Sequence, residues 1–164
     1  MRLLCGSDCV ECETQRRRSL KTEFRKAAMP RELNALITFD RRIFPAADQF
    51  EPEYWRRCES WWLFAGGVKV GCCAFEKRTG RRALYIATTG ILPSYQRQGF
   101  GQLMKAWQIA YAQHHGYRRL ICHSRESNAR MIALNEQFGF RVIRKTPRYY
   151  AEPDEAAVLM ELRL

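Results

Sequence analysis

The sequence predicts one α/β domain with a mixed central sheet of about six to seven strands flanked by about four helices. The chain has 164 residues, 46% of them hydrophobic, which suffices for one domain with a buried core. Alternating and helical periodicities follow one another in the order strand, two helices, three strands, helix, strand, helix, two strands. The strand–helix–strand segment around residue 100 indicates a parallel pair, because two strands joined through a helix run in the same direction.

The first half of the chain supplies a tail, a strand, two helices and three consecutive strands. Residues 1–20 show no clear period and end in three arginines, so we expect an N-terminal tail rich in Cys and Arg, followed by a domain over residues 21–164. Pro30 suits the first turn of a helix, and Gly66-Gly67 is typical of a hairpin turn. The expected strands are residues 21–27, 61–64, 68–75 and 83–92, and the expected helices start near residue 30 and cover residues 51–59.

The second half alternates between helices and strands. Gly116 and Gly139 follow the last residues of two helical patterns, as C-terminal caps do. The expected helices are residues 101–115 and 128–138, and the expected strands are residues 120–124, 141–148 and 156–164.

Positive charge is concentrated in the second half of the chain. The 28 Lys and Arg residues exceed the 17 Asp and Glu residues and give a formal charge of +11. Between residues 83 and 148, ten basic residues stand against two acidic ones, a net +8. Such an excess favours a polyanionic partner, either nucleic acid or a phosphate-bearing cofactor, although a solvated basic surface explains it equally well.

The cysteines and the N-terminus favour a cytoplasmic protein with free thiols. Seven cysteines is an odd number, and no secretory signal or membrane-spanning run of about 20 apolar residues accompanies them, so no membrane partner is expected. Cys5, Cys9 and Cys12 provide three metal ligands without a nearby His, and we therefore expect no metal. The cysteines in apolar contexts are expected in the core: Cys58, Cys72, Cys73 and Cys122.

The turn at residues 96–101, Q-R-Q-G-F-G, lies between an expected strand and an expected helix. Gly99 and Gly101 allow close approach of the backbone, and a helix N-terminus favours an anion, so the turn suits a diphosphate. A structural turn at a helix start is the alternative. A P-loop is excluded because G-x4-G-K-[ST] does not occur, and Met104 stands where a Rossmann fingerprint requires Gly or Ala.

This turn resembles the pyrophosphate loop of the GCN5-related N-acetyltransferase (GNAT) family, Q/R-x-x-G-x-G/A. Residues 127–140, S-N-A-R-M-I-A-L-N-E-Q-F-G-F, are similar to the family's S-N-x-x-A-x-x-L-Y-E-x-x-G-F helix. The resemblance covers residues 21–164 and implies the GNAT fold, N-acetyltransferase activity and acetyl-coenzyme A (acetyl-CoA) as cofactor.

The resemblance also implies where the cofactor binds. Strand residues Thr89, Gly90 and Ile91 would pair with the pantetheine arm, and the Ile91 N–H would polarise the thioester carbonyl. Asn128 would contact the cofactor from the last helix. The pyrophosphate would be held by the amides of Arg97, Gln98, Gly99, Phe100, Gly101 and Gln102.

Acetyl transfer to an amine also needs a group that accepts a proton, and His123 on the short strand is the best candidate. A core histidine bonded to backbone is the alternative, whereas His114 and His115 fall at a helix end. The residues around Tyr85 and His123 resemble the NatE-type catalytic subunits of N-alpha-acetyltransferases, in which a Tyr and a His relay the proton through water. A histidine pKa of about 6.5 lies near that of an α-amine, about 7.7–8.0, and far below that of lysine, about 10.4.

The same subfamily resemblance implies how a peptide acceptor binds. Phe44, Pro45 and Ala46 resemble its substrate-lining loop, and Tyr149-Tyr150 resemble the paired tyrosines that close over the peptide. A pair of aromatic residues capping a sheet edge is the alternative. Bacterial ribosomal-protein acetyltransferases share the Tyr-Tyr hairpin and the Q-R-Q-G-x-G turn, but have Glu where this chain has His123.

One departure from the family concerns the leaving thiolate. Asn135 stands where most members have a Tyr that protonates it, so either the thiolate leaves unaided or a group such as Tyr149 substitutes. The expected acceptor is the α-amine of a protein or peptide. A small amine (polyamine, amino acid or antibiotic) and a catalytically weak binding module that contacts RNA remain as alternatives. Ribosome association and a monomer or homodimer are left open.

Overall fold

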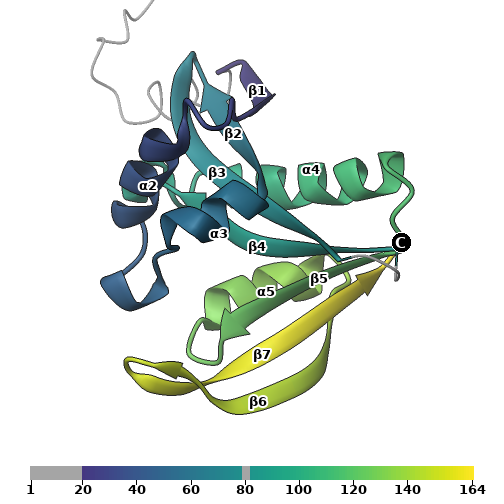
Figure 1. Ribbon diagram of the computed structural model, residues 1–164. Helices are drawn as coiled ribbons and strands as arrows, with labels where there is room; N and C mark the ends of the chain where they lie inside the picture. The colour runs from purple at the N-terminus through teal and green to yellow at the C-terminus, as the bar shows by residue number, and fades with distance from the viewer. Residues whose placement is uncertain (1–19, 79–81) are drawn as a thin grey trace, which may run out of the picture.

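The computed structural model describes residues 20–78 and 82–164 (Figure 1). Within these residues a sheet of seven strands carries four α-helices and two short 3₁₀ turns. The strands are β1 Thr22–Lys26, β2 Glu59–Ala65, β3 Val68–Arg78, β4 Ala83–Ile91, β5 Arg119–Arg125, β6 Arg141–Ala151 and β7 Asp154–Arg163. The helices are α2 Leu33–Arg41, α3 Pro52–Arg57, α4 Phe100–His114 and α5 Ala129–Gln137, with 3₁₀ turns η1 Ala46–Asp48 and η2 Pro93–Tyr95.

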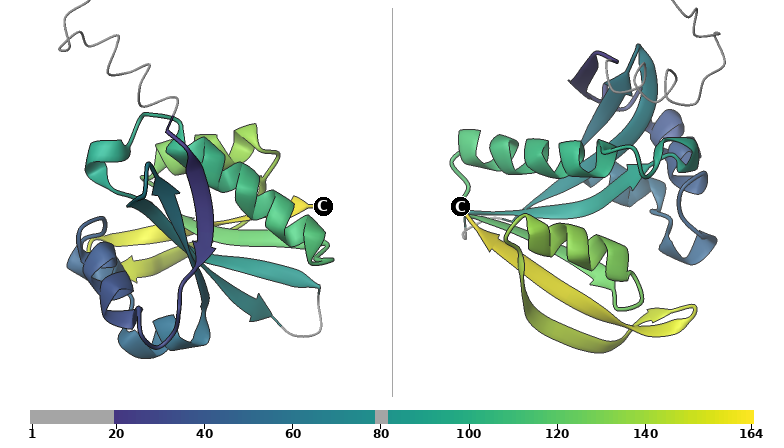
Figure 2. Two further views of the ribbon diagram at one scale, coloured as in Figure 1. Left: turned by 90° about the horizontal axis from the view of Figure 1, so that it is seen from above. Right: turned by 180° about the vertical axis from the view of Figure 1, so that it is seen from behind.

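The strands are ordered β1-β2-β3-β4-β5-β7-β6 across the sheet. All described neighbours are antiparallel except β4 and β5, which are parallel and connected through α4. Helices α2 and α3 cover one face of the sheet, and α4 and α5 cover the other (Figure 2). Parallel neighbouring strands are usually connected by a right-handed crossover. Helix α4, which begins after the end of β4, forms that connection here.

The core has two layers because side chains alternate along each strand. On β3, Cys73 and Phe75 join the cluster that packs against Met104 of α4. Cys72 and Ala74, one residue out of phase, join the cluster that contains Trp55 of α3. A residue's place in the alternation therefore decides which helical layer it meets, and this applies to the functional residues as well.

Strands β4 and β5 pair over four residues and then separate. Ala83–Ile86 pair with Arg119–Cys122. Beyond Ile86, this edge of β4 pairs with no described strand. A bulge in the β3–β4 pairing, where Ala74 faces Thr88 and Phe75 faces Ile86, leaves Ala87 without a partner on β3. Bulges bend and twist a strand. In Figure 1 the two strands run together near the C-terminus and diverge away from it.

The predicted fold class and element order are confirmed, with seven strands and four α-helices. The four cysteines expected in the core are buried. The helix expected near residue 30 begins at Leu33, with Pro30 in the turn before it, and β6 continues to Ala151 instead of ending at residue 148. Among the described helices none is long and apolar enough to cross a membrane. Residues 1–19 of the expected tail, including Cys5, Cys9 and Cys12, lie outside the described residues, whereas Leu20 packs against the core.

Candidate functional site

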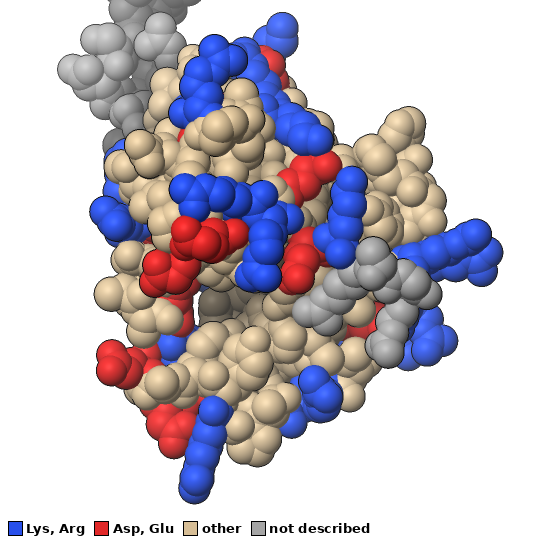
Figure 3. Space-filling model, viewed as in Figure 1, with Lys and Arg blue, Asp and Glu red and all other residues tan. Residues whose placement is uncertain are grey.

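A cavity of about 420 Å³ lies between the separated ends of β4 and β5. On the surface it is a hollow between the part of the molecule that carries α2 and α3 and the part formed by β6 and β7 (Figure 3). Acidic side chains gather at one rim of this hollow. The lining includes Phe44, residues 47–50 and 86–89, Lys105, residues 122–125, Asn128, Met131, Asn135 and residues 149–151.

The turn before α4 presents free backbone donors. Gly99 adopts φ +87° as the N-cap of α4, and no described side chain caps the helix there. No described group accepts a hydrogen bond from the amides of residues 97–102, although Gly99 O accepts from Leu103 N. A Cβ at Gly99 would meet only Gln102 Oε1, at 3.9 Å, so this side of the turn is open. Unpaired N–H groups at a helix N-terminus fit a diphosphate.

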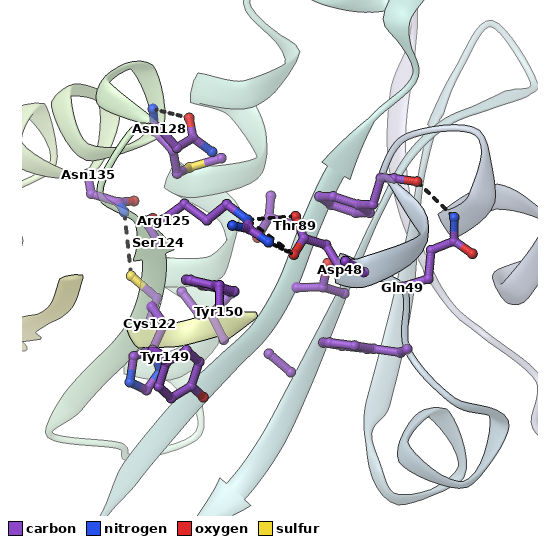
Figure 4. A pocket seen from close by; sticks show the side chains of 18 of the residues that line it. Asp48, Gln49, Thr89, Cys122, Ser124, Arg125, Asn128, Asn135, Tyr149 and Tyr150 are labelled. Carbon is purple, nitrogen blue, oxygen red and sulfur yellow. Dashed lines mark hydrogen bonds and ion pairs between the residues drawn. The ribbon is translucent and has the colours of Figure 1, made fainter. Parts of the chain in front are cut away.

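The residues expected along the pantetheine arm lie on the unpaired edge of β4. Thr89 lines the cavity, and its Oγ1 accepts a hydrogen bond of 2.8 Å from Gln108 Nε2. Gly90 and Ile91 are buried and do not line the cavity. Asn128 does line it, from the start of α5, where its Oδ1 caps the helix by accepting from Met131 N at 3.2 Å (Figure 4).

Tyr85 and His123 meet across the paired part of the two parallel strands. The Tyr85 hydroxyl lies 2.6 Å from His123 Nδ1, and the two rings are 5.5 Å apart at 69°. Tyr85 pairs with Ile121 in the register and packs in a small cluster with it, on the opposite face from Cys122 and α4. By alternation His123 shares the face of Tyr85, which is the face of α2 and α3. His123 lines the cavity, whereas Tyr85 is buried behind it and does not.

The two tyrosines of the β6–β7 hairpin lie beside this pair. The ring of Tyr149 stacks on His123 at 5.2 Å and 15°, and Tyr150 meets Tyr149 edge-on at 5.0 Å. Tyr149 remains 52% exposed, whereas burial raises the pKa of Tyr150 to about 12. Of the loop expected to bind substrate, Phe44 lines the cavity, and residues 47–50 do so in place of Pro45 and Ala46.

Arg125 connects three segments around the cavity, a role that the sequence did not reveal. Its guanidinium donates to both carboxylate oxygens of Asp48, with contacts from 2.7 to 3.2 Å, and to Glu155 at 3.2 Å. It also donates to the carbonyl oxygens of Glu152 and Pro153 and lies 4.1 Å from the ring centroid of Tyr150. These interactions, led by the hydrogen bonds to Asp48, raise its pKa, so it stays charged (Figure 4).

Two further polar residues line the cavity from the side of α4 and α5. Lys105, also missed in the sequence, is 1% exposed, and Asn135 is 1% exposed. His114 and His115 lie instead at the end of α4, away from the cavity. No cluster of metal ligands occurs in the part of the chain that the structure describes.

A model of the acetyltransferase (GNAT) family matches residues 29–140, more than half of the chain. The chain belongs to this family. It is 31% identical over 97 residues to a Drosophila melanogaster protein described as "Probable N-acetyltransferase san", covering 57% of this chain and about half (53%) of that protein. It is 29% identical over 140 residues to N-alpha-acetyltransferase 50 of Danio rerio, covering 80% of this chain and 83% of the relative.

Among solved structures, the ribosomal-protein-S18-alanine N-acetyltransferase from Escherichia coli is similar in fold. The TM-score is 0.77 with 21% identity, and the match covers 87% of this chain and 94% of that one. Together with the family match, this similarity confirms the GNAT fold, and the family match confirms the predictions of an N-acetyltransferase and of acetyl-CoA as its cofactor.

Gly99 tests whether the turn before α4 binds the diphosphate of CoA in this GNAT protein. We expect Gly99→Val to weaken CoA binding about tenfold or more, because a side chain there strains the left-handed backbone and projects where we expect the phosphates to bind. Titration calorimetry with CoA gives the affinity, and thermal unfolding gives the stability.

Gly116→Val is the matched control for this variant. Gly116 has φ +73° and open space around it at the far end of α4, so the same substitution imposes a similar strain away from the turn. Its CoA affinity should stay within about twofold of wild type. Unchanged CoA affinity in Gly99→Val would mean that the diphosphate binds elsewhere.

Proposed function

We propose that the protein acetylates the α-amine of a peptide or protein, with the Tyr85–His123 pair accepting the proton that the amine gives up. The observation that carries this proposal is the 2.6 Å contact between the Tyr85 hydroxyl and His123 Nδ1, placed beside Tyr149 on the face of the cavity opposite α4. A base at this position borders the cavity from one face of the sheet while the diphosphate turn lies at the start of the helix that covers the other.

The cofactor supplies an acetyl group activated as a thioester. The amides of residues 97–102 would hold its diphosphate, and the unpaired edge of β4 at Thr89, Gly90 and Ile91 would pair with the pantetheine arm as an added strand does. Asn128 would contact it from the start of α5. Because Ile91 is buried outside the cavity lining, an N–H nearer the bulge, at residues 87–89, is as well placed to polarise the thioester carbonyl.

An α-amine suits this base better than a lysine side chain does. The attacking nitrogen must be neutral, and near neutral pH an α-amine with a pKa of about 7.7–8.0 is neutral far more often than a lysine with a pKa of about 10.4. A histidine with an ordinary pKa of about 6.5 can take the proton released on attack. The site therefore needs no strong base.

The residues that line the acceptor side of the cavity support a peptide as the acceptor. Phe44, Phe50 and Tyr149 give it apolar surface, and the Tyr150 hydroxyl and the backbone of the hairpin offer hydrogen bonds. The names of two similar proteins, N-alpha-acetyltransferase 50 and the ribosomal-protein-S18-alanine N-acetyltransferase, describe acetylation at an α-nitrogen and at an alanine of a ribosomal protein. Both support the same choice of acceptor for this chain.

A panel of acceptors tests the proposed substrate. We expect thiol release from acetyl-CoA with peptides that have a free α-amine, and none with the same peptides blocked at that amine. Mass spectrometry should place the acetyl group on the first residue. Turnover confined to polyamines, amino acids or antibiotics would overturn the peptide acceptor, and CoA binding without any turnover would indicate a binding module.

The Tyr85–His123 pair should affect turnover more than cofactor binding. We expect His123→Ala to lower kcat about a hundredfold, and Tyr85→Phe to lower it by a smaller factor, with the KM for acetyl-CoA unchanged. His114→Ala, which removes an exposed histidine at the end of α4, should retain full activity. Unchanged kcat in His123→Ala would remove His123 from the mechanism.

Arg125 should position the acceptor without taking part in the chemistry. We expect Arg125→Gln to raise the KM for the peptide about tenfold, because Asp48 and the hairpin lose their shared ionic partner, with the KM for acetyl-CoA within about twofold. Arg119→Gln is the matched control, since Arg119 lies on the same strand and pairs with Glu161 at 2.9 Å outside the cavity. An equal effect of both substitutions would show a general loss of stability.

A further inference from the structure

Lys105 is a buried cation without an ionic partner. It lies on the second turn of α4, is 1% exposed and lines the cavity. No described residue forms an ion pair or hydrogen bond with its ammonium group, and Nζ lies 4.9 Å from the ring centroid of Phe140. Desolvation lowers its pKa, and the titratable groups that face it are the thiols of Cys73 on β3 and Cys122 on β5.

A buried unpaired lysine destabilises the free protein, so packing does not explain it. Lysine is rarely fully buried unless paired, because its charge loses hydration. A leucine or methionine at this position would pack beside Phe140 at no such cost. The position therefore indicates a function for the amine, and the cavity that Lys105 lines is where the amine can exert it.

A second buried group at this end of the cavity also lacks a partner. Asn135 Nδ2 donates weakly to Cys122 Sγ at 3.4 Å and to Met160 Sδ at 3.6 Å. Its Oδ1 is buried and accepts from no described group. A buried polar atom without a partner is costly. Lys105 on α4 and Asn135 on α5 thus leave unmet polar groups at the same end of the cavity, which points to a polar ligand atom there.

The other titratable groups around the cavity are either bound to ionic partners, poor acids or placed on the acceptor side of the sheet. Arg125 donates hydrogen bonds to Asp48, Glu155 and two carbonyl oxygens. The carboxylates, Asp48 above all, raise its pKa. Burial raises the pKa values of Cys122 and Tyr150 and so makes both poor acids. Tyr149 stacks on His123, on the acceptor side of the sheet. Of these groups, Lys105 combines a lowered pKa with a position on the side of α4 and α5.

We propose that Lys105 protonates the sulfur of the leaving coenzyme, which extends the function proposed above and rests on it. As the acceptor nitrogen bonds to the acetyl carbon, the carbon–sulfur bond breaks and its electron pair stays on sulfur. Lys105 Nζ gives that sulfur a proton and becomes a neutral amine, the form that its buried site favours. The acceptor nitrogen loses one proton to the Tyr85–His123 pair. After release, solvent takes the proton from His123 and returns one to Lys105.

Lys105→Met keeps the size and apolar surface of the side chain and removes the proton. We expect kcat to fall about tenfold or more with the KM for acetyl-CoA unchanged, while the melting temperature stays level or rises because a buried charge is gone. Lys105→Arg should not restore kcat, because guanidinium does not give up a proton at working pH. Lys77→Met, at an exposed lysine on β3, controls for the loss of one positive charge.

A binding experiment tests the same contact without turnover. Wild type should bind CoA about tenfold more tightly than desulfo-CoA, which lacks the thiol, because a sulfur bonded to a charged amine is worth more than a neutral contact. In Lys105→Met the two affinities should become equal. Asn135→Tyr, which places a phenol at the same end of the cavity, should partly restore kcat in the Lys105→Met background and add little in wild type.

The outcomes separate this proposal from the proposed function. Normal peptide acetylation by Lys105→Met, or equal affinities for CoA and desulfo-CoA in wild type, would overturn the role of Lys105 and leave the function standing. A wild-type protein that prefers CoA through Lys105 but acetylates no peptide would retain the sulfur contact and overturn the peptide acceptor.

Discussion

The separation of β4 and β5 after four paired residues is the constraint on which the rest of the structure depends. Two parallel strands that stayed paired would leave no cavity and no free backbone edge. The bulge at Ala87 bends β4 away from its neighbour, and groups on both faces occupy the space that opens. Arg125 and Asp48 span it on the face of α2 and α3, and Asn135 and Met131 of α5 border it on the other. The cavity therefore reaches both faces of one sheet.

Alternation along β5 would place the two proposed proton transfers on opposite faces of the sheet, with His123 on one face and Lys105 of α4 beyond the other. On β5, Cys122 faces α4 and α5, whereas His123, the next residue, faces the opposite side. A group that accepts a proton and a group that donates one can thus lie close to the same reacting carbon without neutralising each other. The basic residues between positions 83 and 148 include some that line the cavity and others that are exposed on the surface. Lys105 and Arg125 line the cavity, while the basic side chains of β6 are exposed and serve neither face of the site.

The sequence predicted the fold well because glycines and periodic patterns mark its elements, and it predicted the site only where motifs are local. Gly99 precedes the first residue of α4, and Gly116 and Gly139 follow the ends of α4 and α5, as expected. The burial of α4 is harder to infer from the sequence, because Ala110, an apolar residue of this helix, is exposed. The buried face contains Lys105 and Gln108 instead. A pattern of apolar residues cannot reveal a buried lysine, and nothing local to Arg125 distinguishes it from the other arginines until Asp48 is brought beside it.

The unmet polar groups of the cavity connect stability to binding. Asn135 Oδ1 is buried without a hydrogen-bond partner among the described residues, and Lys105 is 1% exposed with no carboxylate paired to it there, so the free protein carries a desolvation cost at both side chains. A ligand that supplies a partner removes that cost, and the free energy recovered adds to its own affinity. Apolar residues at these positions would stabilise the free protein but would add nothing to the affinity for a ligand. On the role proposed for Lys105, the two side chains would weaken the empty fold and strengthen the complex, which is the balance expected where a site binds a polar atom that the chain itself does not provide.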